Sequence, residues 1–307
     1  MRRGPRPGRG IRVTRSRVDV AAETDWRRLL ECDDVHLVDI CPPGDSHAEI
    51  AVAALRAGKH VLCEKPLANS VAEAEAMVAA AETARARGRL AMVGFHYRRT
   101  PAVAPARRMI RDGRIGTLRH VRAGYLQDWL VDPEAPLTWR LRREQAGSGA
   151  LGDLGAHLVA LAQYLAGGWR ASRRSPAPSY GNGRGTVTVD AAALFTGRFP
   201  SGALAFDLER LNELAFHDRT EPADAVGFRR ILATEPGHPY LEAWWPPGHG
   251  LGYEHTFVHQ ARDLVYAIAA GTEPAPAFAD GLQVQRVLAA VEDRAAKDCT
   301  YTPVPCS

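Results

Sequence analysis

Residues 35–68 read VHLVDICPPGDSHAEIAVAALRAGKHVLCEKPLA, and the order of apolar runs and turns in this stretch decides the predicted fold. The compact apolar run 35–40 ends at Cys-Pro-Pro-Gly, which is typical of a buried parallel strand running into a turn. The segment 46–49 (SHAE) predicts a capping box that begins a helix, and Gly58 is placed to end it. A second short strand follows at 60–63, so the stretch predicts a βαβ unit.

The same alternation continues on both sides of this stretch. A short helix is expected from Thr24, and an alanine-rich helix begins at a second capping box, 70–73. A strand at 90–95 and a helix at 101–112 follow. We therefore expect residues 19–116 to form a Rossmann-type α/β domain with helices on both faces of a parallel sheet.

After Gly116 the pattern changes. Helices are expected at 151–165, around the apolar face of 257–268, and at 282–294, and strands at 118–126, 186–199, 203–216 and 228–234. Strands that cluster together with helices outside them predict an α+β second domain, 117–307, built on an open sheet. An acid-free segment near 167–185 is expected to be an irregular loop.

Composition narrows the class of protein. The net charge of +4 comes mainly from the segment near 167–185 and from residues 1–18, which we expect to be an irregular basic tail, so no nucleic-acid surface is predicted. The five cysteines include no CxxC pair, which argues against a metal site or a disulfide framework and favours the cytoplasm. No apolar run approaches the length of a membrane span.

The tripeptide Glu64-Lys65-Pro66 follows a predicted parallel strand, and ligands of open α/β sheets bind outside the carboxyl ends of the strands. Pro66 restricts Lys65 to an extended conformation. An ammonium held there can stabilise an alkoxide as a hydroxyl loses its proton. The tripeptide alone is equally compatible with a surface lysine paired with Glu64.

The second candidate group is Asp153 and His157, which are four residues apart and would share one face of a helix. A carboxylate can orient an imidazole, which then accepts a proton near neutral pH. An ordinary surface pair is the alternative. Taken with Lys65, the pair supplies a cation, a base and an orienting carboxylate, which is the inventory that alcohol oxidation by hydride transfer needs.

Four blocks follow one another in the chain: CPPGDSH from Cys41, AGKHVLCEKPLA from Ala57, Trp139-Arg140, and GSGALGDLGAH from Gly147. Over about residues 35–165 they resemble the successive signatures of the glucose–fructose oxidoreductase / inositol dehydrogenase (Gfo/Idh/MocA) family. The later WWPPGHGLGYEHTF from Trp244 resembles a sugar- and inositol-type branch. The resemblance implies a Rossmann-type domain followed by a domain with an open, mostly antiparallel sheet, which could also form a homo-oligomer.

The resemblance also implies roles for residues. His157 would be the catalytic acid/base, Asp153 its partner, and Lys65 the group that polarises the hydroxyl. The nicotinamide side of NAD or NADP would be lined by Cys41, Pro42, His47, Glu64 and Lys65. Candidates for the pocket of a sugar or polyol are Trp139, Arg140 and His255. Each of these three could instead be plain structure.

The chain departs from the family pattern at its start. No GxGxxG precedes Val35, so we expect the first βαβ unit, with its phosphate loop, to be missing. The residue that would choose between NAD and NADP is missing too. Smaller departures are His96 and Gly44, at positions where relatives often carry asparagine.

Three functions remain open at this stage. The first is an NAD(P)-dependent dehydrogenase that oxidises a secondary hydroxyl of a sugar or cyclic polyol. The second is a catalytically impaired relative that binds a sugar or a partner without redox turnover. The third uses the same cofactor for redox-assisted cleavage of a glycosidic bond.

Overall fold

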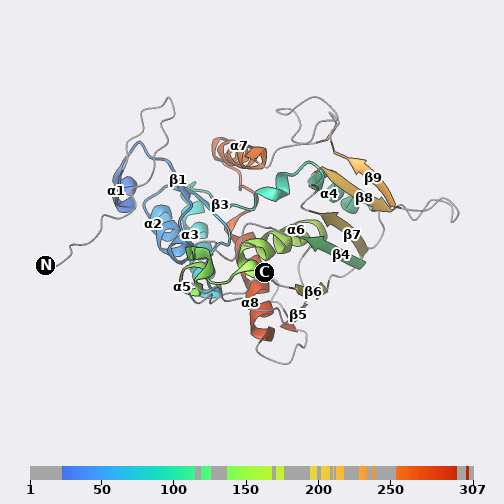
Figure 1. The fold of residues 1–307 in the computed structure, drawn as a ribbon. Helices are drawn as coiled ribbons and strands as arrows, with labels where there is room; N and C mark the ends of the chain where they lie inside the picture. Colours follow the sequence, from blue (N-terminus) through green and yellow to red (C-terminus); the bar gives the residue numbers. More distant parts are fainter. Residues whose placement is uncertain are drawn as a thin grey trace.

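A computed structural model of the protein describes residues 23–114, 119–125, 137–167, 171–175, 194–198, 202–207, 210, 212–217, 228–233, 237–238, 254–295 and 302–303. Figure 1 shows β1 (Leu37–Ile40) and β3 (Ala91–Val93) with α2 (His47–Arg56) and α3 (Val71–Arg85) on one side of the molecule. The strands from β4 (Arg119–Gly124) to β9 (Phe228–Leu232) lie on the opposite side together with α4 (Val103–Arg111), and α6 (Ala156–Ala166) and α8 (Phe278–Ala295) lie between the two groups. The expected basic tail and the expected loss of the first βαβ unit concern residues 1–22, outside the described part. In the described part, no helix is long and apolar enough to cross a membrane.

The first sheet is parallel, as the sequence predicts. Its strands β1 (Leu37–Ile40), β2 (His60–Cys63) and β3 (Ala91–Val93) lie in that order, with Leu37 opposite His60. The helices of this part are α1 (Trp26–Glu31), α2 (His47–Arg56), α3 (Val71–Arg85) and α4 (Val103–Arg111). All of these elements were expected, so the alternation of strands and helices is confirmed.

Only the serine cap of the second predicted capping box, 70–73, forms as expected, because the Glu73 carboxylate binds the backbone N–H of Asn69 and not that of Ser70. Ser70 Oγ accepts a hydrogen bond from Glu73 N at 3.2 Å, and Glu73 Oε2 accepts one from Asn69 N at 3.1 Å. The prediction for Ser46 is wrong, because its hydroxyl donates backward to Pro43 O at 2.8 Å within the 3-10 turn η1 (Gly44–Ser46). The hydroxyl used in that turn makes no capping hydrogen bond to α2.

The described strands of the second part form two sheets. One has the order β4-β7-β8-β9, with β4 and β7 parallel and the other neighbours antiparallel, and the other is antiparallel with the order β10-β5-β6. The strands are β4 (Arg119–Gly124), β5 (Ala171–Ser175), β6 (Leu194–Arg198), β7 (Gly202–Asp207), β8 (Glu213–His217), β9 (Phe228–Leu232) and β10 (Thr302–Pro303). The segment near 167–185 was expected to be irregular, and β5 corrects this: its polar sequence has no apolar face to signal a strand, yet β6 pairs with its backbone.

The helices of the second part join the two predicted domains. They are α5 (Arg143–Ala146), α6 (Ala156–Ala166), α7 (Glu254–Ala270) and α8 (Phe278–Ala295), with the short turn η3 (Trp139–Leu141) and the π-helical η4 (Leu151–Gly155). The first part also has a short turn, η2 (His96–Arg99), between β3 and α4. Helix α8 packs against α3 and α6. One apolar core therefore contains Leu55 of α2, Val159 of α6 and Val287 of α8. The boundary at 116/117 stays a prediction.

Candidate active site

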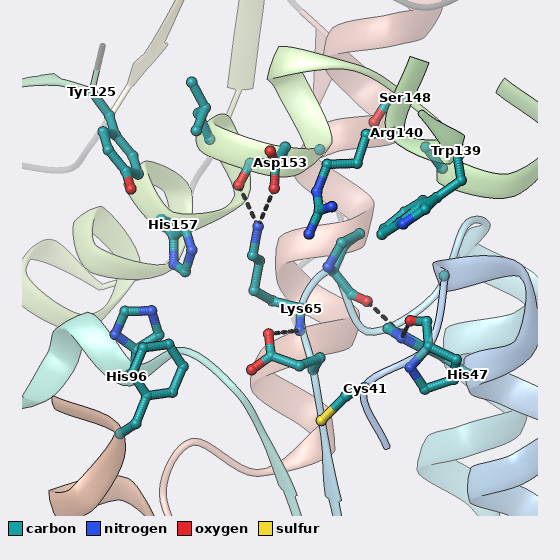
Figure 2. Close-up of a pocket in the computed structure, with 18 residues that line it drawn as sticks. Cys41, His47, Lys65, His96, Tyr125, Trp139, Arg140, Ser148, Asp153 and His157 are labelled. Carbon is teal, nitrogen blue, oxygen red and sulfur yellow. Dashed lines mark hydrogen bonds and ion pairs between the residues drawn. The ribbon is translucent and has the colours of Figure 1, made fainter. Parts of the chain in front are cut away.

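A cavity of about 430 Å³ lies where the carboxyl ends of β1, β2 and β3 meet the segment from η3 to α6. Nine predicted site residues line it: Cys41, Pro42, His47, Glu64, Lys65, Trp139, Arg140, Asp153 and His157. Figure 2 shows Lys65 and Asp153 between His157 and His96 on one side and Trp139 and Arg140 on the other. Lys65 and His157, which the sequence analysis assigned to one reaction, therefore line the same cavity.

Lys65 joins the two halves of the cavity. Its ammonium Nζ lies 2.5 Å from Asp153 Oδ1 and donates to the carbonyl oxygen of Asp153 at 2.7 Å. The side chain of Lys65 is 13% exposed, so the ammonium faces the cavity more than bulk solvent. Because a half-buried ion pair with a second hydrogen bond is held firmly, Asp153 fixes where the Lys65 charge lies.

The expected contact between Asp153 and His157 is absent from the described hydrogen bonds. The sequence predicted that they share a face at α-helical spacing, but residues 151–155 form one turn of π-helix, η4. A π-turn takes more residues than an α-turn, so positions four apart no longer stack. Asp153 turns to Lys65 instead, and the predicted carboxylate–imidazole pair is wrong as a contact.

His157 is buried, at 3% exposure, among aromatic rings. The ring of Tyr97 stands edge-on at a centroid distance of 4.7 Å and that of His96 at 5.2 Å. Burial, then the charges of Lys65 and His96, lowers the pKa of His157 well below its ordinary value. Nδ1 of His157 is buried without a hydrogen-bond partner. The ring is therefore neutral at neutral pH and able to accept a proton.

His96 follows β3 and forms the cavity wall beneath His157. Its Nδ1 lies 2.7 Å from Thr256 Oγ1, and the ring of Phe257 stacks on it with centroids 4.1 Å apart. Burial, then the charges of Lys65 and Arg99, lowers the pKa of His96 to about 3. The second imidazole of the site is thus neutral as well.

The start of α7 lies at the cavity, but the residues involved are not the His255 that was expected. Phe257 lines the cavity and Thr256 holds His96, whereas His255 is not among the lining residues. Tyr125, at the end of β4, was also missed: it lines the cavity and its hydroxyl lies 2.7 Å from that of Tyr97.

The wall on the β1 and β2 side is tied together by His47. Its Nε2 lies 2.9 Å from Pro42 O and its Nδ1 3.0 Å from Pro66 O, which connects the turns after the two strands. Burial raises the pKa of the Glu64 carboxyl. Desolvation, followed by the charges of Asp39 and Glu64, raises the pKa of the Cys41 thiol to about 12, so Cys41 is no nucleophile here.

The rim carries Trp139 and Arg140, with the guanidinium carbon 4.5 Å from the centre of the indole ring. An aromatic ring and a multiple hydrogen-bond donor at the rim can stack on and bind a polyhydroxylated ring.

Two glycines make room for Asn69, which sequence reasoning missed. Asn69 Nδ2 donates to Gln145 O at 3.1 Å, so its side chain connects the segment between β2 and α3 to α5. A Cβ at Gly44 would lie 2.5 Å from Asn69 Oδ1, and one at Gly147 would lie 2.8 Å from the same atom. Gly147 also has a φ of +74°, which disfavours other residues.

Comparison with known proteins places this site in a family. Residues 6–95 match the protein family described as "Oxidoreductase family, NAD-binding Rossmann fold". Residues 103–206 match the family described as "GFO/IDH/MocA C-terminal domain". The levoglucosan dehydrogenase of Pseudarthrobacter phenanthrenivorans is 38% identical over 92% of this chain and 83% of its own length. The chain belongs to the Gfo/Idh/MocA oxidoreductase family.

Solved structures of Gfo/Idh/MocA relatives share the fold. An oxidoreductase domain protein from Kribbella flavida is 56% identical, with a TM-score of 0.85 over 92% of this chain and 84% of that one. A levoglucosan dehydrogenase in complex with NADH and levoglucosan is 39% identical, with a TM-score of 0.83 over 92% and 84%. The match to an NAD-binding Rossmann fold confirms the expected nicotinamide dinucleotide as the cofactor class.

Proposed function

We propose that the protein is an NAD-dependent dehydrogenase that oxidises a secondary hydroxyl of a sugar or a cyclic polyol. The observation that carries the proposal is the meeting of Lys65, Asp153 and neutral His157 in one cavity of about 430 Å³. The similarity to a levoglucosan dehydrogenase, solved with NADH and levoglucosan, supports a sugar as substrate.

The residues of the β1 and β2 wall fit a nicotinamide. Cys41, Pro42 and Glu64 line the carboxyl ends of the strands, where ligands of this sheet type bind, and His47 holds their turns in place. A bound NAD would supply the hydride acceptor for the carbon that carries the substrate hydroxyl.

Lys65 and His157 divide the remaining work. The Lys65 ammonium donates a hydrogen bond to the substrate oxygen and stabilises the negative charge that develops on it. Asp153 holds the ammonium in place through its carboxylate and its carbonyl oxygen. The hydroxyl proton goes to the neutral ring of His157, which lines the same cavity as Lys65.

The sugar itself would lie against the rim. We propose that Trp139 stacks on one face of its ring and that Arg140 donates to its hydroxyls, while Tyr125 closes the far side. Phe257 takes the place in this proposal that sequence reasoning gave to His255.

The test is reduction of NAD⁺, followed by the absorbance of the NADH formed, with levoglucosan, aldoses and inositols as substrates and NADP⁺ in parallel. We expect cofactor-dependent turnover with at least one sugar or polyol, and preference for NAD⁺. Stabilisation of the protein by a sugar without any turnover would instead favour the binding-only alternative. Release of a cleaved aglycone without net NADH would favour redox-assisted glycosidic cleavage.

A further inference from the structure

A second cavity, of about 410 Å³, shares the short helix η2 with the active site. His96 lines the active-site cavity, whereas Arg98 and Arg99 line the second one. The remaining walls come from Arg107 of α4, Tyr164 of α6, residues of α7 and the segment 272–275 that leads to α8. No role in the proposed dehydrogenase reaction has been given to this cavity.

Two of its arginines are buried and incompletely bonded. Arg98 is 6% exposed and Arg99 2% exposed. Arg98 Nη2 donates to Asp280 Oδ1 at 3.2 Å, and Arg99 donates to Asp263 Oδ2 at 2.7 Å and to Ala275 O at 2.8 Å. Nε of Arg98 and Nη1 of Arg99 are buried without any partner. Unbonded guanidinium nitrogens inside a protein are costly, because they have given up water without replacement.

The third arginine, Arg107, forms no ion pair with a carboxylate of the described residues. The guanidinium of Arg107 lies 3.8 Å from the centre of the Tyr164 ring, and that of Arg98 lies 5.0 Å from the same centre. The two carboxylates that line the cavity are already engaged, Asp263 by Arg99 and Glu273 by Arg85 outside it. The cavity therefore carries an excess of positive charge.

We propose that this cavity binds a small oxyanion, such as a phosphate or a carboxylate-bearing metabolite. Guanidinium groups bind both classes through paired hydrogen bonds, and an anion would offset the uncompensated charge of Arg107. Burial lowers the pKa of Arg98, which agrees with a cation that lacks sufficient negative charge around it. The proposal is independent of the dehydrogenase activity.

The test is titration of the intact protein with inorganic phosphate and with citrate, at constant ionic strength set by NaCl. Binding is followed by calorimetry and by the thermal unfolding midpoint. Arg107→Gln is the test variant, since this exposed side chain can be changed without emptying the core. Arg108→Gln is the matched control, because Arg108 is the exposed neighbour on α4 and does not line the cavity.

We expect saturable binding of at least one of the two anions. The anion that binds more tightly shows whether the cavity prefers a phosphate or a carboxylate. Arg107→Gln should weaken that binding by about tenfold, the loss typical of one charge-assisted contact, and Arg108→Gln should leave it unchanged. Absence of saturable binding into the tens of millimolar range would overturn the proposal. Equal weakening by both substitutions, or by neither, would also overturn it, because the anion would then bind elsewhere.

Discussion

The low pKa of His96 makes an acid-stability prediction that can be worked from the structure. In the folded protein the pKa of His96 lies at about 3, whereas the ordinary value is 6.5. Below pH 6.5 the unfolded chain binds a proton at this residue and the folded protein does not. The contribution of neutral His96 to the free energy of unfolding is therefore complete above pH 6.5, its ordinary pKa, and is lost as the pH falls below that value.

The magnitude follows from that interval. An assay at about pH 5 lies roughly 1.5 pH units below the ordinary pKa of 6.5, and each unit corresponds to ~1.36 kcal/mol. His96 should therefore account for about 2 kcal/mol of the unfolding free energy that the protein loses on acidification to about pH 5. His96→Asn does not titrate, and its side chain can keep a hydrogen bond to Thr256. The free energy of unfolding in urea is measured for both proteins at about pH 7.5 and at about pH 5.

We expect His96→Asn to be less stable than the wild type near neutral pH, because it leaves a gap beside Phe257. Its further loss on acidification, however, should be smaller than the wild-type loss by about 2 kcal/mol. His36→Asn, which removes an exposed imidazole, is the control and should keep the wild-type loss. If His96→Asn lost as much stability as the wild type between the two pH values, the reasoning about this buried ring would be refuted.

Three further predictions concern the active-site cavity and its surroundings. The value of kcat/KM should stay level from about pH 8 to about pH 6, because the pKa of His157 lies well below 6.5; an acid limb centred near 6.5 would contradict this. Gly44→Ala should lower the free energy of unfolding in urea by about 1–3 kcal/mol, because the new methyl group would clash with the Asn69 side chain, and the loss should be clearly smaller in an Asn69→Ala background. Equal losses in both backgrounds would contradict the close packing of Gly44 against Asn69. Ser70→Ala should cost about 1 kcal/mol in the same assay because its hydroxyl caps α3, and an unchanged unfolding midpoint would contradict the cap.

The sequence predicted the first sheet well because each signal there is local. Apolar runs mark β1 and β2, and the positive φ of Gly58, at +76°, ends α2 where a glycine was expected to end it. The position of Lys65 at a strand end, which the sequence showed directly, placed it in the cavity.

Features that depend on tertiary structure escaped the sequence. The π-turn η4 has no known sequence signature, so Asp153 was paired with His157 and not with Lys65. Strand β5 forms because β6 lies beside it, and its own residues carry no strand pattern. His96 could have been found, because it follows β3 at the same edge of the sheet as the ends of β1 and β2, where ligands bind.

The central claim is that the Lys65 ammonium, fixed by Asp153, acts on a sugar hydroxyl in the cavity it shares with His157. The most direct measurement is the rate at which deuterium passes from a sugar, labelled at the carbon to be oxidised, to NAD⁺ at saturating cofactor. We predict transfer by the wild type and a rate lower by about 10²–10³ for Lys65→Met, with NADH binding still detectable by fluorescence. Deuterium transfer by Lys65→Met at the wild-type rate would contradict the account.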